Sequence, residues 1–176
     1  MRKTSVSFLV ALLALTAGCS LNDLLKLAGA DTSASCTADD THVVSANVSG
    51  VAFDDCTVSA TGAPSSSFVI SANSGDAVPS TLTITMSGAG TAGEYKLGGD
   101  TADGDDNGVF IKGDELLGED TEAASYKTKE DVESGTVTLT EVTDARLVGT
   151  FSFTATNQVD ETKTLEVTDG AFDVAF

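Results

Sequence analysis

Residues 149–156 read GTFSFTAT, and this stretch decides the fold class of the chain. Phe151, Phe153 and Ala155 alternate with small polar residues, so every second side chain is apolar. Successive side chains of a β-strand point to opposite faces of a sheet, whereas an amphipathic helix repeats its apolar residues every three or four positions. The stretch therefore predicts a half-buried strand with a phenylalanine-rich inner face.

The same two-residue period recurs from residue 41 onward. It predicts strands at 42–48, 51–59, 66–72, 81–86, 93–97, 108–112, 123–128, 136–142, 149–156, 163–168 and 171–176. Turn-forming residues separate these runs at Ser49-Gly50, Gly62-Ala63-Pro64, Asn73-Ser74-Gly75-Asp76, Gly98-Gly99 and Asp169-Gly170. Short strands joined by close turns predict an all-β fold, an antiparallel β-sandwich or barrel of about 10 strands. The polar and acidic stretch 99–122 is interpreted as the longest irregular loop, although 108–112 has a strand pattern.

The amino-terminal segment has the order of a secretory signal peptide. Arg2 and Lys3 precede an apolar run, Phe8–Ala17, that is too short to span a bilayer as a helix. The run leads into Thr16-Ala17-Gly18-Cys19, which resembles the lipobox of bacterial lipoproteins. The alternative is an ordinary cleaved signal followed by a chance cysteine.

The lipobox resemblance implies a domain organisation and a location. Residues 1–18 would be the lipoprotein signal peptide, residues 19–40 a tether that begins with lipidated Cys19, and residues 41–176 a single β domain. Each buried CH₂ group of an acyl chain contributes about 0.8 kcal/mol, so two or three chains on Cys19 would anchor the protein stably to a membrane. Ser20 stands where such lipoproteins often carry the Asp that retains them in the inner membrane. We therefore expect a lipid-anchored protein of the cell envelope, at the outer membrane.

The chain is strongly acidic, with a formal net charge of -18 at pH 7. Such a charge repels nucleic acid, so we expect no nucleic-acid partner. Two explanations of the excess acid remain open. One is adaptation to high salt, which screens self-repulsion, and the other is cation binding.

After lipidation of Cys19, two cysteines remain, Cys36 and Cys56. An even pair in an exported protein predicts a disulfide, which would close a loop of about 20 residues and stabilise the fold by about 3 kcal/mol. Free thiols or a metal site are the alternatives. His42 is the only histidine, so a zinc site would be short of ligands.

The stretch DTADGDDNG at 100–108 is the candidate metal site. Its oxygen-bearing side chains are those of Asp100, Asp103, Asp105, Asp106 and Asn107. Calcium takes six to eight oxygen ligands, and glycines let a loop fold around the ion. The spacing departs from the EF-hand pattern. A solvated acidic loop without Ca²⁺ is the alternative, and no other cofactor is expected.

The carboxy-terminal third contains three motifs. They are G-x-V-x-L-T at Gly135–Thr140, G-T-F-x-F within Val148–Phe153, and V-T-x-G-x-F-x-V at Val167–Val174. They resemble the end of a family of small bacterial lipoproteins of uncharacterised function that is common in Bacteroidota. The resemblance extends over roughly residues 42–176. It implies a β-rich, lipid-anchored domain and carries over no catalytic residue.

Three classes of function remain. We expect a structural or interaction module of the envelope that binds a protein or glycan partner. The alternative is a small-ligand or Ca²⁺-binding β domain. An enzyme, such as a hydrolase with paired acids, is the third class. No G-x-S-x-G or P-loop motif is present in the sequence.

Overall fold

The structure is a computed structural model that describes residues 42–63, 66–76, 78–99, 106–113 and 124–176, the side chains of residues 54–56 excepted. These residues belong to one compact unit, residues 35–176. They form ten strands, β1 (His42–Val48), β2 (Val51–Ala63), β3 (Ser67–Ser74), β4 (Thr81–Ser87), β5 (Gly93–Gly98), β6 (Asn107–Ile111), β7 (Ser125–Lys127), β8 (Glu133–Val142), β9 (Arg146–Asn157) and β10 (Thr164–Ala175). The predicted all-β class is confirmed. Within the described residues, no helix is long and apolar enough to cross a membrane.

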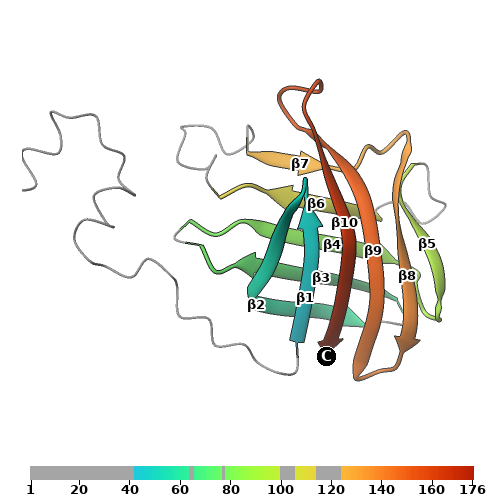
Figure 1. The fold of residues 1–176 in the computed structure, drawn as a ribbon. Coiled ribbons are helices and arrows are strands. Elements are labelled where there is room, and N and C mark those ends of the chain that lie inside the picture. Colours follow the sequence, from blue (N-terminus) through green and yellow to red (C-terminus); the bar gives the residue numbers. More distant parts are fainter. Residues whose placement is uncertain (1–41, 64–65, 77, 100–105, 114–123) are drawn as a thin grey trace, which may run out of the picture. The chain divides into compact units, whose positions relative to one another are not determined.

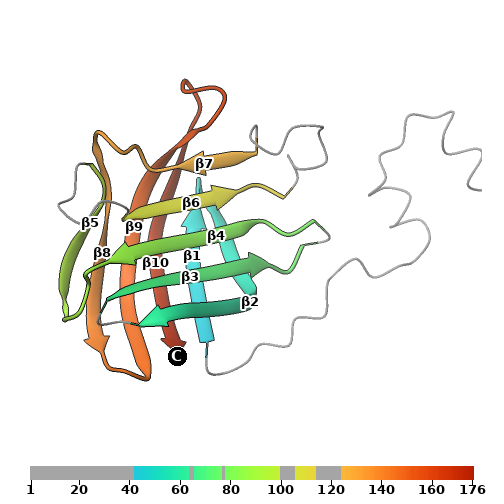
Figure 2. The same ribbon diagram turned by 180° about the vertical axis from the view of Figure 1, so that it is seen from behind.

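The ten strands form one antiparallel sheet that closes on itself. Neighbours follow the order β10-β1-β2-β3-β4-β6-β7-β9-β8-β5, and β10 also pairs with β9. The β9–β10 pairing completes a ring of strands, and β8 and β5 branch from it at β9. Figure 1 shows two layers whose strands cross. One layer contains β1, β10, β9, β8 and β5, and the other contains β2, β3, β4, β6 and β7, which Figure 2 shows from the opposite side.

Strand β2 connects the two layers. Its first residues, Val51–Asp54, pair with β1, whereas Asp55–Ala63 pair with β3. The register with β3 shifts between Asp55 and Thr57, so Cys56 lies at a bulge. A bulge bends a strand and increases its twist. The bend lets β2 leave one layer and enter the other.

The interior is filled by the apolar residues that the two-residue period places on one face. The predicted inward residues that are buried are Leu82, Ile84, Met86, Val137, Leu139, Phe151, Phe153, Ala155, Leu165, Val167, Phe172 and Val174. They belong to one continuous hydrophobic cluster. A single core therefore holds both layers, since burial of apolar surface is the main driving force of folding.

Three glycines of the carboxy-terminal motifs lie opposite phenylalanines on the neighbouring strand. The register pairs Gly135 with Phe153, Gly170 with Phe151, and Gly149 with Phe172. A Cβ atom added at Gly170 would lie 2.5 Å from the ring of Phe151, and one at Gly149 would lie 2.7 Å from the ring of Phe172. Both distances are too short for real carbon contacts. The glycines therefore leave the space that the rings occupy.

The same rings pack on one another and reach the second layer. Phe151 stacks on Phe153 with ring centroids 6.3 Å apart and on Phe172 with centroids 6.2 Å apart. The ring of Phe153 also covers Gly108 of β6, where an added Cβ would lie 2.8 Å from it. Such a stack buries a large apolar area and adds about 0.5–1.5 kcal/mol for each aromatic pair. It joins β9 and β10 of one layer to β6 of the other.

The predicted turn at Asp169-Gly170 is wrong. Strand β10 is continuous across it, and its register with β9 shifts between Val167 and Gly170. Asp169 has φ 51°, so the pair forms a bulge rather than a reversal. An Asp-Gly pair can adopt positive φ both in a turn and in a bulge. Here β10 pairs with β1 on one side and β9 on the other, and this pairing keeps the chain extended. At Ser49-Gly50, where both φ values are positive, the predicted hairpin turn is confirmed.

Two smaller expectations also fail. The stretch 99–122 is not one irregular loop, because the strand predicted within it at 108–112 is confirmed as β6 and contributes the buried Phe110. The two-residue period places Glu141 and Phe176 on the inner face, but Glu141 is exposed because the β8 register shifts after Leu139. Phe176 is 37% exposed and contacts the ring of Phe68 from one side.

Arg146, the first residue of β9, forms a bidentate ion pair with Asp173 near the end of β10. Its Nε donates to Asp173 Oδ1 at 2.8 Å, and its Nη2 donates to Asp173 Oδ2 at 2.6 Å. These hydrogen bonds, more than the charge itself, lower the pKa of Asp173 below its ordinary value and raise the pKa of Arg146. The pair lies on the surface, so its contribution to stability is modest.

We expect Gly170→Ala to destabilise the domain by about 1–3 kcal/mol, because the added methyl group would overlap the Phe151 ring. Denaturant unfolding measures the loss. Gly93→Ala on β5 is the matched control, since its Cβ would have no neighbour closer than 3.9 Å. If the ring contact causes the loss, the double variant Gly170→Ala, Phe151→Leu should lose less free energy of unfolding than the sum of the losses of the two single variants. Equal stability of the two alanine variants would contradict the packing argument.

Arg146→Gln should lower the melting temperature at neutral pH, with an effect that fades in acid. Because the folded pKa of Asp173 lies below the ordinary 3.8, its stabilisation is complete above that value and is lost as the pH falls through the folded pKa. Thermal unfolding of both chains from neutral pH to about pH 2 tests this. A difference in melting temperature that stays constant over this range would show that the ion pair is not its cause.

Candidate functional site

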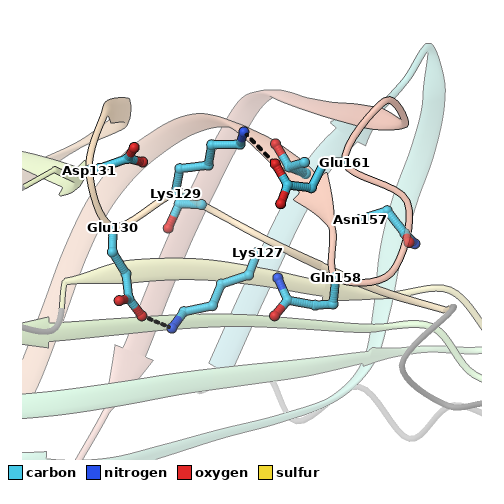
Figure 3. A pocket seen from close by; sticks show the side chains of 9 residues that line it. Lys127, Lys129, Glu130, Asp131, Asn157, Gln158 and Glu161 are labelled. Atoms are coloured by element: carbon cyan, nitrogen blue, oxygen red, sulfur yellow. Dashed lines mark hydrogen bonds and ion pairs between the residues drawn. The ribbon is translucent and has the colours of Figure 1, made fainter.

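A polar hollow lies between two connections at one end of the sheet, the β7–β8 connection (128–132) and the β9–β10 connection (158–163). It is open to solvent, has a volume of about 360 Å³ and is lined by Lys127, Thr128, Lys129, Glu130, Asp131, Thr156, Asn157, Gln158 and Glu161. Figure 3 shows these side chains gathered from both connections and from the ends of β7 and β9. We call this site the loop hollow.

Asn157 fixes the β9–β10 side of the loop hollow. The side chain is 2% exposed, and its Oδ1 accepts hydrogen bonds from the main-chain N–H groups of Val159 at 3.0 Å and Asp160 at 2.9 Å. The main chain of Gln158 donates to Ser125 O of the β7 strand at 2.9 Å. An asparagine that bonds the backbone two residues on stabilises a turn. The connection therefore has a defined conformation before any ligand binds.

The β7–β8 side is held by the glycine pair that ends β5. Gly99 N donates to Lys129 O at 3.0 Å, and Lys129 N donates to Ser134 Oγ at 3.3 Å. Gly98 has φ 71°, and an added Cβ would collide with the carbonyl oxygen of Lys129. The buried Thr128 also accepts from Gly108 N through its Oγ1. Backbone contacts on both sides thus hold Lys129 at the rim of the hollow.

Two ion pairs cross the surface of the loop hollow. Lys127 Nζ lies 2.9 Å from Glu130 Oε1, and Lys129 Nζ lies 3.4 Å from Glu161 Oε2 (Figure 3). The second pair joins the two connections. Exposed pairs of this kind contribute about 0–1 kcal/mol, so a ligand can replace either carboxylate at small cost. The site therefore offers ammonium, carboxylate, amide and hydroxyl groups to one ligand.

The structure describes two of the five candidate calcium ligands, Asp106 and Asn107. The carboxylate of Asp106 is mostly buried and accepts a hydrogen bond from Ser87 N, and its main-chain oxygen accepts one from Gly98 N at 2.9 Å. Asp106 thus joins the ends of β4 and β5. Asp100, Asp103 and Asp105 lie outside the described residues. No group of three His, Cys, Asp or Glu side chains suited to a metal occurs within the described part of the chain, and calcium binding stays a prediction.

The predicted cysteine chemistry falls mainly outside the described residues. Cys19 and Cys36 precede residue 42, where the description begins. The backbone places Cys56 at the bulge of β2, and its side chain is not described. Lipidation of Cys19 and the Cys36–Cys56 disulfide therefore stay predictions.

The sequence did not single out the residues of the loop hollow. A usable signal was the position of Lys127 and Lys129, because Lys and Arg together number only 9 in the chain. Lysines that are two residues apart share one face of an extended segment. The connection that lies opposite the two lysines is determined by the order of the strands in the sheet. That order cannot be read directly from the sequence.

The family model DUF6252, a domain of unknown function, matches residues 40–174. The chain belongs to the DUF6252 family. No curated protein and no solved structure matches it. The expected membership of an uncharacterised family is thus confirmed. The DUF6252 match covers the three carboxy-terminal motifs and both connections of the loop hollow.

Proposed function

We propose that this DUF6252 chain is a lipid-anchored protein of the bacterial cell envelope whose β domain is a binding module. The anchor is supported by the order of the first residues, in which two basic residues, an apolar run and small residues precede Cys19. The tether, residues 19–40, would hold the domain near the outer membrane while leaving its loops accessible. This arrangement suits a protein that contacts other envelope components.

The loop hollow is the observation that supports binding. Its volume of about 360 Å³ lies within the range of small-ligand sites. Most such sites are lined by apolar side chains, whereas all nine residues that line this one are polar or charged. The partner that fits is an uncharged, hydroxyl-rich molecule, since carboxylates accept hydrogen bonds from hydroxyl groups and amides both accept and donate them. We therefore favour a glycan over an apolar ligand.

The proposal assigns no reaction to the domain. Both lysines that line the hollow lie beside carboxylates, and an ammonium group has no free electron pair for nucleophilic attack. The hydroxyl of Thr128 is already bonded to the main chain of Gly108. The geometry of these residues supports recognition rather than catalysis.

The anchor predicts a fatty-acid label that depends on Cys19. When bacteria produce the full chain, we expect a fatty-acid probe to label it and the chain to sediment with membranes. Cys19→Ser should abolish the label and release the chain, because acyl chains cannot be attached. Cys56→Ser is the matched control and should keep the label. A wild-type chain that is unlabelled and free in the medium would contradict the anchor.

Binding at the loop hollow can be measured on the full chain in detergent with an array of neutral oligosaccharides. We expect Lys129→Ala and Gln158→Ala to reduce binding of any positive glycan by about tenfold, which corresponds to about 1.4 kcal/mol of lost hydrogen bonding. Lys96→Ala on β5 removes a similar exposed ion pair elsewhere and should leave binding unchanged. The glycan site would be contradicted if no oligosaccharide on the array bound the chain. It would also be contradicted if all three variants bound as tightly as the unchanged chain.

A further inference from the structure

Charged residues are distributed unequally between the two layers of the fold. From Thr57 of β2 through β3, β4, β6 and β7, the only charged residue in the strands is Lys127, the last residue of β7. Strands β5, β8, β9 and β10 of the other layer carry Glu94, Lys96, Glu133, Glu141, Arg146, Glu166, Asp169 and Asp173. We call the outer surface of the first layer, from Thr57 onward, the neutral face. Its strands are the ones that lie in front in Figure 2.

The register places small polar and β-branched residues in rows across the neutral face. One row runs Ser59, Ser71, Thr83 and Val109 on β2, β3, β4 and β6, and it ends at Lys127 on β7, the edge strand of the face. Hydroxyl and amide groups on this face bond to one another, as Ser71 Oγ does to Thr83 Oγ1 at 2.8 Å and Thr81 Oγ1 does to Asn73 Oδ1 at 2.7 Å. A polar group that already has a partner can be covered without loss of a hydrogen bond. The neutral face is thus suited to contact with protein.

We propose that the neutral face packs against the same face of a second copy of this chain. The whole chain carries a net charge of -18, so two copies repel each other wherever their acidic surfaces meet. The neutral face is the described surface on which two copies can approach without placing carboxylates opposite each other. A two-fold axis through the face would bring its rows of Ser, Thr and Val together, and sheets pack about 10 Å apart in this way.

Other partners fit the neutral face less well. Nucleic acid and anionic lipid require several cations, and Lys127 is the only one that these strands supply. The aromatic rings that could stack on a sugar point inward in these strands, because Phe68, Phe110 and Tyr126 are all buried. A polymer that binds by stacking would have no platform here.

The size of the face determines how strong the contact can be. Five strands about 4.8 Å apart, each contributing about six residues of 3.3 Å, give a surface of roughly 480 Å². A stable complex needs about 800 Å² from each partner. The pairing is therefore weak in free solution and becomes populated where a common membrane concentrates the copies, which rests on the proposed anchor at Cys19.

Crosslinking of the full chain in bacterial membranes tests the contact. Thr83 lies on β4, the middle strand of the neutral face, and Val109 lies beside it on β6. With Thr83→Cys or Val109→Cys, a short bismaleimide should join two copies into a dimer seen on a denaturing gel. Thr154→Cys, an exposed threonine on β9 of the charged layer, is the matched control. We expect at least a tenfold higher dimer yield from the two neutral-face variants, above the background of the parent chain with its own cysteines.

Added carboxylates should weaken the contact between the two neutral faces, and added salt should strengthen it. Adding Thr83→Glu to the Val109→Cys chain should remove the dimer, because it places carboxylates in the contact. Raising the NaCl concentration should increase the yield, since salt screens the repulsion between the acidic surfaces. Equal yields from Val109→Cys and Thr154→Cys, no dimer from either neutral-face variant, or a crosslink to a different protein would overturn the proposal.

The anchor and the contact can fail separately. If both hold, Cys19→Ser should lower the dimer yield of Thr83→Cys because the copies are no longer concentrated on a membrane. If only the anchor fails, Cys19→Ser leaves that yield unchanged, and the difference between Thr83→Cys and Thr154→Cys is seen when the purified chain is concentrated in solution. If only the contact fails, the fatty-acid label is present and that difference is absent.

Discussion

The ring of Phe151 covers Gly170 of β10 and stacks on Phe153 and Phe172, and this packing constrains the rest of the structure. The strands can bring their rings this close only where the facing residue has no side chain. Because Phe153 also covers Gly108 of β6, the stack fixes the separation of the two layers at the same point. The motif glycines are therefore packing positions, and their spacing in the sequence follows from the register of β8, β9 and β10.

The closure of the sheet into a ring determines where the loop hollow lies. One edge of β9 pairs with β8 as far as Phe153 and then with β7 at Thr156 and Asn157. The connection between β7 and β8 must pass over the point where β9 changes partner, and it meets the β9–β10 connection there. Buried Asn157 and the glycine pair after β5 then hold both connections by main-chain hydrogen bonds. A site on loops gains defined geometry from such support.

The total charge of the chain and the position of its charges have different consequences. A net charge of -18 affects solubility and the choice of partners for the whole molecule. Salt adaptation and cation binding are both explanations of that total. The separation of a charged layer from an uncharged one is instead a property of the fold, since it depends on which strands become neighbours. The proposal on the neutral face starts from this separation rather than from composition, whereas the proposal on the loop hollow starts from the polar side chains that two connections bring together.

The sequence by itself determined the all-β class, most strand positions and the inward-facing residues, because a two-residue period is a local property of the chain. It could not determine that Asp169-Gly170 forms a bulge, since a turn and a bulge both accept positive φ and only the partner strands select between them. It predicted the strand that carries Phe110 but could not show that β4 and β7 are its partners, or that Lys129 meets Glu161 across two connections. These features depend on contacts between residues far apart in the chain. Strand order, which only the tertiary structure decided, brings those residues together.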